Sequence, residues 1–188
     1  MKRIFEIDWK NLNNHNLDNH NLDNHNLNNH NLTNNYIRAG IIPYTIQNNI
    51  IFFAFSIDNN IACLGDFGGH YEDIDNDLLD TAIREYTEES LNVFGYLNRE
   101  FLKDCFVIEG PETIEIFVFV SPPFYQYTER FNNMIVGNKQ HEVQNIIWLS
   151  RRQLLNLIDN QEISFDGVKI YHMYTRLYDC LKTYRNYL

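Results

Sequence analysis

The sequence is poor in basic residues, in cysteine and in long apolar runs. Fifteen Lys and Arg stand against 25 Asp and Glu, and the net charge of −10 argues against an electrostatic grip on long DNA or RNA. No apolar run reaches the ~20 residues of a membrane span. The start, MKRIFEIDWK, lacks the apolar stretch of a signal peptide. We therefore expect an intracellular, cytoplasmic protein (for a viral protein, the host cytoplasm or the virion) that binds neither DNA nor a membrane.

The three cysteines agree with this expectation. Cys63, Cys105 and Cys180 are odd in number and widely spaced, which fits buried reduced thiols in an intracellular protein.

The first 35 residues differ in composition from the rest. Residues 11–35 repeat Asn-Leu-(Asn/Asp)-Asn-His and contain no aromatic residue, Gly, Pro, Lys or Arg. A period of five matches neither a helix nor a flat strand, and about five repeats are too few for a stacked repeat fold. We predict that residues 1–35 form a low-complexity, disordered leader and that residues 36–188, which hold nearly all the aromatic residues, form one domain.

From Tyr36 onward the pattern predicts alternating strands and helices. Two β-branched and aromatic runs, 36–46 and 48–58, are separated by a hairpin signal at 47–49. A short strand then runs into Gly68–Gly69 and is followed by a helix over 77–94. Two further strands are expected at 104–110 and 113–123, and a loop over 124–140. The last elements are a strand at 142–150, a helix that begins with Ser150 as N-cap, and a helical tail over 169–188. Strands flanked by two or three helices indicate an α/β or α+β sandwich.

The predicted helix 77–94 carries a cluster of like charges. Glu85, Glu88 and Glu89 lie at i, i+3 and i+4 on one face, where each such pair costs roughly 0.2–0.5 kcal/mol. A divalent cation removes this repulsion, and carboxylate oxygens suit Mg²⁺ or Mn²⁺. The preceding glycine pair, Gly68–Gly69, allows close approach of backbone, so that a carbonyl there can join the metal shell. The alternative is a solvated acidic face, on which Asp80, Arg84 and Glu88 form an i, i+4 ladder.

These residues resemble the signature of a known family. Residues 84–91, Arg-Glu-Tyr-Thr-Glu-Glu-Ser-Leu, resemble the core of the Nudix box, G-x5-E-x7-R-E-U-x-E-E-x-G-U with U apolar, and Gly68–Gly69 with Glu72 resemble its opening. The resemblance covers residues 69–91 and implies a Nudix-like α/β/α sandwich with a mixed central sheet.

The sequence departs from the box at three points. The segment between Gly69 and Arg84 is one residue longer than the pattern, so the first Glu falls on Asp75 or Asn76. That position supports the loop and the start of the helix, and we expect an Asp to suffice. Ser90 replaces the second Gly, and we expect the helix to continue through it. The three glutamates are retained, so the resemblance implies an active enzyme; the alternative is a catalytically impaired Nudix-fold module that binds a nucleotide or a partner.

A second resemblance lies downstream, where residues 142–148 match the family's E-x5-W strand. It implies the following roles: metal ligands Glu85, Glu88 and Glu89, with a carbonyl of Gly68 or Gly69; a general base at Glu85 or Glu142; and Arg84 to orient the glutamates. The implied reaction is Mg²⁺- or Mn²⁺-dependent hydrolysis of a pyrophosphate bond in a nucleoside diphosphate linked to another group. The acidic balance favours a small nucleotide over capped RNA, and the oligomeric state is left open.

One further segment has two interpretations. The aromatic residues of 122–127 and Phe131 offer faces on which a nucleobase can stack, or their rings pack beneath the loop.

Overall fold

The computed structural model describes residues 2–3, 37–58, 61, 63–138, 140–165, 167 and 169–188. The repeat at 11–35 lies outside these residues, as does the prediction of a low-complexity leader over 1–35 except at Lys2–Arg3, which form a strand paired with Phe106–Val107. In chain order the elements are β1 (Lys2–Arg3), β2 (Arg38–Gln47), β3 (Ile50–Asp58), β4 (Cys63–Gly65), β5 (Phe67–His70), α2 (Leu78–Ser90), α3 (Arg99–Leu102), β6 (Phe106–Glu109), β7 (Thr113–Phe119), α4 (Tyr125–Ile135), β8 (Val143–Ser150), α5 (Arg151–Asn160), β9 (Ile163–Ser164), β10 (Ile170–Met173) and α6 (Thr175–Thr183).

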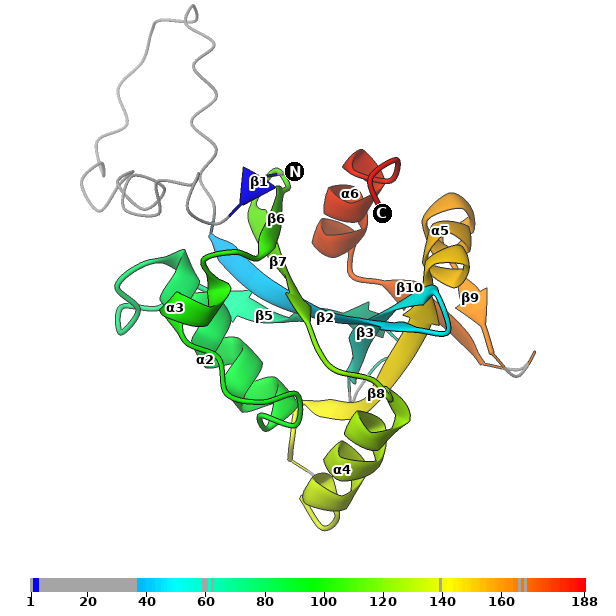
Figure 1. The fold of residues 1–188 in the computed structure, drawn as a ribbon, viewed down its shortest axis with the longest axis horizontal. Helices are drawn as coiled ribbons and strands as arrows, with labels where there is room; N and C mark the ends of the chain where they lie inside the picture. Colours follow the sequence, from blue (N-terminus) through cyan, green and yellow to red (C-terminus); the bar gives the residue numbers. More distant parts are fainter. Residues whose placement is uncertain are drawn as a thin grey trace, which may run out of the picture.

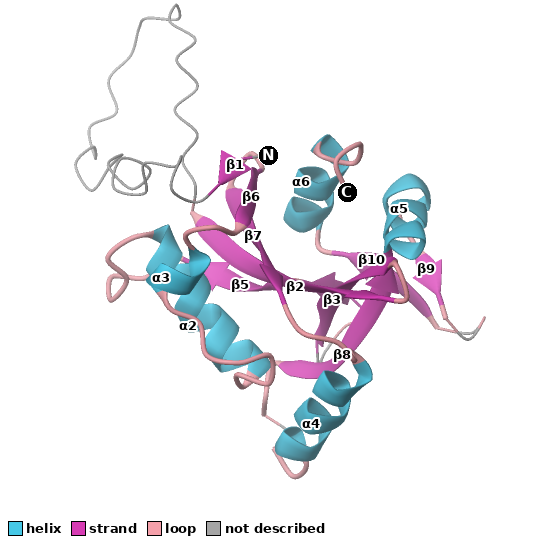
Figure 2. Cartoon of the chain, in the orientation of Figure 1, coloured by secondary structure: helices cyan, strands magenta, loops and turns pink. Residues whose placement is uncertain are grey.

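The strands form one mixed sheet (Figures 1 and 2). Its main path runs β1-β6-β7-β2-β3-β4-β10-β9, with β5 paired to β2 and β8 paired to β3. The β2–β7 and β4–β10 pairs are parallel and the other pairs are antiparallel. The sequence prediction of an α/β sandwich with a mixed central sheet is therefore confirmed.

Helices cover both faces of the sheet. Figure 1 shows α2 and α4 on one side and α5 and α6 on the other. Strand β2 alternates between them: Ala39 and Ile41 belong to the core cluster that contains Tyr86 of α2, whereas Ile42 belongs to the cluster that contains Leu177 of α6. This alternation is what the period of two in a strand requires when both faces are buried.

Most predicted elements are present, and the hairpin turn and the Ser150 cap are as predicted. The hairpin turns at Asn48 and Asn49, whose φ values of 52° and 61° are those of a tight two-residue hairpin turn. Asp77 caps α2 by accepting from the backbone N–H groups of Leu79 and Asp80. Ser150 caps α5 in a capping box with Gln153.

Three predictions about secondary structure were wrong. Residues 125–135, expected as loop, form α4, because Tyr127 and Phe131 stand four residues apart and are both buried against the core. The tail does not begin as a helix, since Ile170–Met173 forms a strand that pairs antiparallel with β9 and then parallel with β4. Helix α2 does not continue beyond Ser90: Leu91 adopts a left-handed conformation with φ 53°, and the Ser90 hydroxyl accepts from the Asn92 N–H.

Two further findings concern the cysteines and the length of the helices. The three cysteines carry free thiols, with Cys180 buried and the other two half-buried. In the described part of the chain, no helix combines the length and the apolar character that crossing a membrane requires.

Candidate active site

A polar cleft of about 500 Å³ opens beside helix α2. One wall is the exposed face of α2, and the other is the segment between α4 and β8. The cleft brings together four of the sequence-predicted side chains on the helix with the fifth from the opposite wall. Its lining residues are Glu72, Arg84, Glu85, Glu88, Glu89, Asn138, Gln140, His141 and Glu142.

The glycine pair lies directly against the glutamates of α2. The Gly68 N–H donates to Glu89 Oε2 over 3.1 Å. A Cβ on Gly69 would overlap the Glu85 carboxylate, with Oε2 only 2.6 Å away. Glycine at these two positions therefore allows strand β5 to approach within contact distance of two carboxylates, which no other residue type would permit at Gly69.

Arg84 links the helix to the loop that precedes it. Its guanidinium donates to Glu85 Oε1 over 2.7 Å and lies 3.6 Å from a carboxylate oxygen of Glu88. It also donates twice to Asp75, from Nε to Oδ1 and from Nη2 to Oδ2, each over 3.0 Å, and once to the His70 carbonyl. The arginine thus fixes the orientation of Glu85 through charge-assisted hydrogen bonds.

Asp75 is one of the two residues on which the first glutamate of the box pattern falls. It accepts from the Thr81 hydroxyl over 2.9 Å and from the Glu72 backbone N–H over 3.1 Å, in addition to the fork from Arg84. Burial alone would raise the pKa of Asp75, but these hydrogen bonds hold it below its usual value. The neighbouring candidate, Asn76, points its amide at Asp80 instead.

Of the ion-pair ladder expected along α2 between Asp80, Arg84 and Glu88, only the second pair is present. Arg84 contacts Glu88, but Asp80 pairs with Arg99 from α3 over 2.6 Å. Arg99 also pairs with the N-cap, Asp77. Helix α3 was not predicted, so its arginine could not be included in the ladder.

Ionisation of the buried glutamates is opposed by their surroundings. Burial raises the pKa of Glu89 to about 9, and repulsion from Asp66 and Glu85 adds to the effect. Burial also raises the pKa of Glu85, although Arg84 offsets part of that increase. A cation close to both carboxylates would stabilise their charged forms.

The residues present fit a hard divalent cation. Within the described residues, no three His, Cys, Asp or Glu side chains are gathered closely enough to form a ligand cluster as they stand. The electron-pair donors that helix α2 contributes to the cleft are nevertheless all carboxylate oxygens, the ligand type that Mg²⁺ and Mn²⁺ prefer. Glu85, Glu88 and Glu89 are the side chains that would hold such an ion. The two glycine carbonyls considered from the sequence are engaged otherwise: that of Gly68 accepts from Arg38, and Gly69 is paired with Ala39 in the β2–β5 ladder.

The opposite wall is tethered to the helix by a histidine. Both ring nitrogens of His141 face carbonyl oxygens: that of Val143 at 2.9 Å and that of Glu88 at 3.2 Å. The ring also lies edge-on to Phe131 of α4, with centroids 5.7 Å apart. This arrangement places Glu142, the next residue, on the cleft lining opposite α2. Sequence reasoning missed His141, although it directly precedes the glutamate that was singled out.

Sequence reasoning also missed a buried charge cluster behind the glycine pair. Arg38 on β2 pairs with Asp66, with Glu115 at 3.1 Å, with the Thr113 hydroxyl at 3.1 Å and with the Gly68 carbonyl at 3.0 Å. Both carboxylate side chains are fully buried. One oxygen of each, Asp66 Oδ2 and Glu115 Oε2, has no hydrogen-bond partner in the described part of the chain. The sequence feature that could have indicated this cluster is a single charged residue in each of two largely apolar strands, Arg38 in β2 and Glu115 in β7.

This cluster supports strand β5 at its glycines, and its charges also act on Glu89. Gly40 and Gly68 are cross-strand neighbours, and the Asp66 carboxylate fills the space in which either residue's Cβ would lie. Burial raises the pKa of Glu115 well above its usual value, and the charge of Asp66 adds to the effect. Since a buried ion cluster rarely stabilises a fold better than apolar side chains do, its position behind β5 indicates a role in holding the glycine pair.

Gly69→Ala is expected to disturb the site without unfolding the domain. The added methyl group displaces the Glu85 carboxylate, so divalent-cation-dependent turnover should fall roughly 10–100-fold, as for other changes that misplace a metal ligand. Initial rates measure the effect. Glu85→Asp, which shortens the displaced side chain, should restore part of the lost rate in the Gly69→Ala background. A Gly69→Ala enzyme with the wild-type rate would contradict the described contact.

Comparisons with known proteins give matches in structure and none in sequence. No protein-family model matches the chain, and no curated protein matches it. Among solved structures, the chain is similar to a Caenorhabditis elegans Ap4A hydrolase in a binary complex, with a TM-score of 0.46, 16% identity and 80% of this chain aligned to 95% of that one. It is also similar to the NUDIX domain of Shewanella oneidensis NrtR crystallised with ADP ribose (TM-score 0.38, 12% identity, 64% and 76% covered) and to a NUDIX hydrolase described from Listeria monocytogenes (TM-score 0.38, 14% identity, 80% and 95% covered).

Proposed function

We propose that this protein is a Nudix-type hydrolase that cleaves a pyrophosphate bond in a nucleoside diphosphate linked to another group. One observation carries the proposal: Glu85, Glu88 and Glu89 face one cleft, with Gly69 in contact with the first and Gly68 bonded to the third. The acidic cleft repels a polyphosphate unless a cation intervenes, which makes the activity dependent on Mg²⁺ or Mn²⁺.

Each residue of the cleft has a distinct task in this proposal. A divalent cation, when bound by the three glutamates, neutralises phosphate oxygens and lowers the pKa of the attacking water. Arg84 holds the Glu85 carboxylate by a hydrogen bond, and Arg38 donates to the Gly68 carbonyl. The two anchors fix the carboxylates before substrate arrives, so that little reorganisation is needed during the reaction.

Glu142 is the general base that we favour. Its side chain is exposed on the cleft lining, whereas Glu85 already accepts a short hydrogen bond from Arg84. A base must offer a free oxygen to the water that it deprotonates. The water proton then passes to Glu142, and the oxygen attacks one phosphorus of the pyrophosphate. The bond from this phosphorus to the bridging oxygen breaks, and the other phosphate leaves with that oxygen.

Glu142→Gln should therefore lower kcat by about 10²–10⁴-fold, with little change in the apparent affinity for Mg²⁺. The same substitution at Glu85 should weaken Mg²⁺ binding as well. Steady-state rates measured across a range of Mg²⁺ concentrations separate the two effects. If Glu142→Gln leaves kcat unchanged, the base is elsewhere.

The test of the function is hydrolysis of a panel of small phosphoanhydrides. It should include a nucleoside triphosphate, a dinucleoside polyphosphate, a nucleoside diphosphate sugar and a capped oligonucleotide, each with and without Mg²⁺. We expect Mg²⁺-dependent release of two phosphate-terminated products from at least one of the small substrates. Saturable binding of a panel member without turnover would instead favour a nucleotide-binding module that does not hydrolyse its ligand.

A further inference from the structure

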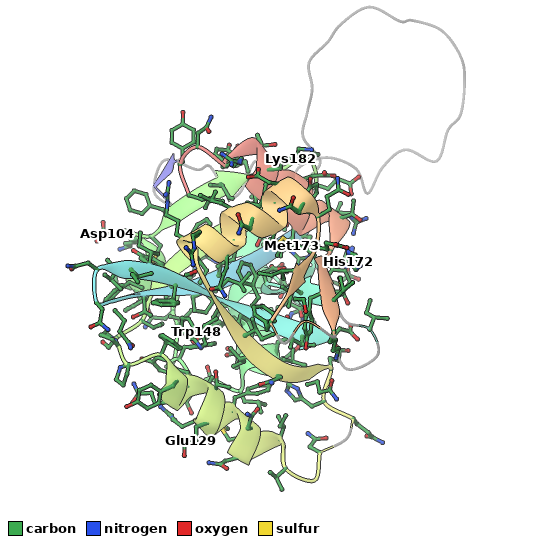
Figure 3. The ribbon with its side chains drawn as sticks, turned by 90° about the vertical axis from the view of Figure 1, so that its right-hand side faces the viewer. Asp104, Glu129, Trp148, His172, Met173 and Lys182 are labelled. Atoms are coloured by element: carbon green, nitrogen blue, oxygen red, sulfur yellow. The ribbon has the colours of Figure 1, made fainter. Side chains whose placement is uncertain are left out.

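A second cavity, of about 610 Å³, lies away from the cleft, between helix α4 and the outer edge of strand β8. It shares no lining residue with the cleft. Along β8, Trp148 comes six residues after Glu142, a path of about 20 Å in an extended strand. Figure 3 shows Trp148 close to helix α4, which carries Glu129. We call this cavity the β8 groove.

The aromatic residues of the 122–131 segment divide between the core and this groove. Tyr127 and Phe131 are buried in the core, so for these two the prediction that the rings pack under the segment is confirmed. Phe124 lies against Trp148, with ring centroids 5.4 Å apart, and both rings line the groove. Phe165 forms a further wall and is itself 42% exposed.

The main chain of β8 leaves one residue open in the groove. Strand β8 pairs with β3 on one side only. On its other side, Ile146 is already satisfied: its N–H donates to Asn145 Oδ1 over 2.8 Å and its carbonyl accepts from the Thr128 hydroxyl over 3.4 Å. Ser150 is satisfied as well, since its N–H donates to Gln153 Oε1 over 2.9 Å.

Trp148 stands between these two capped positions. Residues two apart in an antiparallel strand direct their main-chain groups to the same side, so the N–H and C=O of Trp148 face outward as those of Ile146 do. No partner for either group is present among the described residues, and the indole Nε1 of Trp148 is buried without a partner too. The groove therefore offers one donor and one acceptor from a single residue, beside aromatic walls.

One open main-chain N–H and C=O, both from Trp148, suit a small ring with a polar edge better than a peptide strand. A peptide strand needs several consecutive open residues to pair, and β8 has only one, because its neighbours are capped by side chains. A flat heterocycle with an adjacent acceptor and donor needs only that one. Among the described lining residues, Glu129 is the single charged side chain and no Lys or Arg is present, so the groove repels phosphate and accepts an amino-bearing ring.

We propose that the β8 groove binds a nucleobase, with its ring against Phe124 and Phe165 and its polar edge on the main chain of Trp148. The cavity volume lies within the range of small-molecule sites, and rings with one polar edge are what such sites commonly accept. The site is separate from the acidic cleft, and binding there needs neither the metal nor hydrolysis.

The chain itself provides a reporter for this site. It contains two tryptophans, Trp9 and Trp148, so a Trp9→Phe variant of the full chain leaves Trp148 as the single indole. Adenosine titrated in the presence of EDTA should change the Trp148 fluorescence in a saturable manner, with a Kd of roughly 0.1 mM for a ligand of this size. Phe165→Ala should weaken binding several-fold. Tyr96→Ala, which removes a ring that is 87% exposed outside the groove, should not.

Two analogues test the contact with the Trp148 main chain. N6,N6-dimethyladenosine lacks the donor for the carbonyl, and 1-deazaadenosine lacks the acceptor for the N–H, while both keep the stacking surface. Each should bind at least tenfold more weakly, because one main-chain group stays unpaired. Equal binding of all three compounds would show stacking alone and overturn the main-chain contact. No saturable response to adenosine, or a response that Phe165→Ala leaves unchanged, would overturn the site.

Discussion

Glu88→Gln should abolish Mg²⁺-dependent hydrolysis while leaving the fold intact. The Glu88 side chain is 62% exposed and contacts Arg84 only at 3.6 Å, so its charge contributes little to stability. As a metal ligand, however, it cannot be replaced by a neutral amide without weakening the site. Changes in residues that merely support a ligand cost about 10–100-fold in metal affinity or activity, and loss of a ligand should cost at least the upper figure.

The measurement is the initial rate on the best substrate of the panel, together with urea unfolding of both proteins. Glu162→Gln is the matched control, because it removes an exposed carboxylate outside the cleft. We expect the control to retain the wild-type rate and both variants to unfold at the wild-type urea concentration. A Glu88→Gln protein with the wild-type rate would remove Glu88 from the metal site.

Arg38→Met should strongly destabilise the domain. The Arg38 side chain is only 13% exposed and donates to Asp66, Glu115, Thr113 and Gly68. Burial alone would lower the pKa of Arg38, but Asp66 and Glu115 raise it well above its usual value, so the residue is always charged. Removing the guanidinium leaves two buried carboxylates without a counter-charge, which typically costs 3–5 kcal/mol.

Urea unfolding monitored by circular dichroism measures this cost. Arg185→Met is the matched control: Arg185 also makes two hydrogen bonds to a carboxylate, that of Asp159, but on an exposed surface. We expect the free energy of unfolding of the Arg185→Met control to equal that of the wild type. An Arg38→Met protein as stable as wild type would show that the cluster does not depend on its cation, and would remove the argument that it anchors β5.

The fold could be predicted from the sequence wherever local chemistry and tertiary packing agree. The hairpin at Asn48–Asn49 and the cap at Ser150 are local signals, and each is present as expected. Helix α4 could not be predicted in this way, since it has no capping side chain and is held by two buried rings, Tyr127 and Phe131. Its existence depends on contacts with distant segments of the chain.

The prediction of a helical tail over 169–188 was wrong at its start for a similar reason. Ile170–Met173 has apolar residues at a spacing that fits a helix, yet it is a strand because the edge of β4 is available for parallel pairing. Leu91, which follows the last residue of α2, shows a further limit: nothing about a leucine indicates a left-handed helix end, so the continuation of α2 was a reasonable but wrong expectation.

In the candidate site too, the residues close together in the sequence could be predicted, and most of those brought together by strand pairing could not. The glutamates, the glycine pair and Arg84 lie within 22 residues of one another, so their spacing alone indicated that they share a site. Glu142 was named from a pattern, and the structure places it on the cleft lining with them. Arg38 and Glu115 were missed because their partners lie 28 to 77 residues away, and only pairing of β2 with both β5 and β7 brings them together.

The central claim is that the α2 glutamates form a divalent-cation site, and a calorimetric titration with Mg²⁺ tests it most directly. Because the pKa of Glu89 is raised to about 9, this carboxyl holds its proton at pH 7 and must release it when the cation binds. Titrations in two buffers of different ionisation enthalpy should therefore show saturable binding with net proton release, and an affinity that rises with pH up to about pH 9. Glu89→Gln should lose both the proton release and most of the affinity. Absence of binding, or a Glu89→Gln isotherm identical to that of the wild type, would contradict the claim.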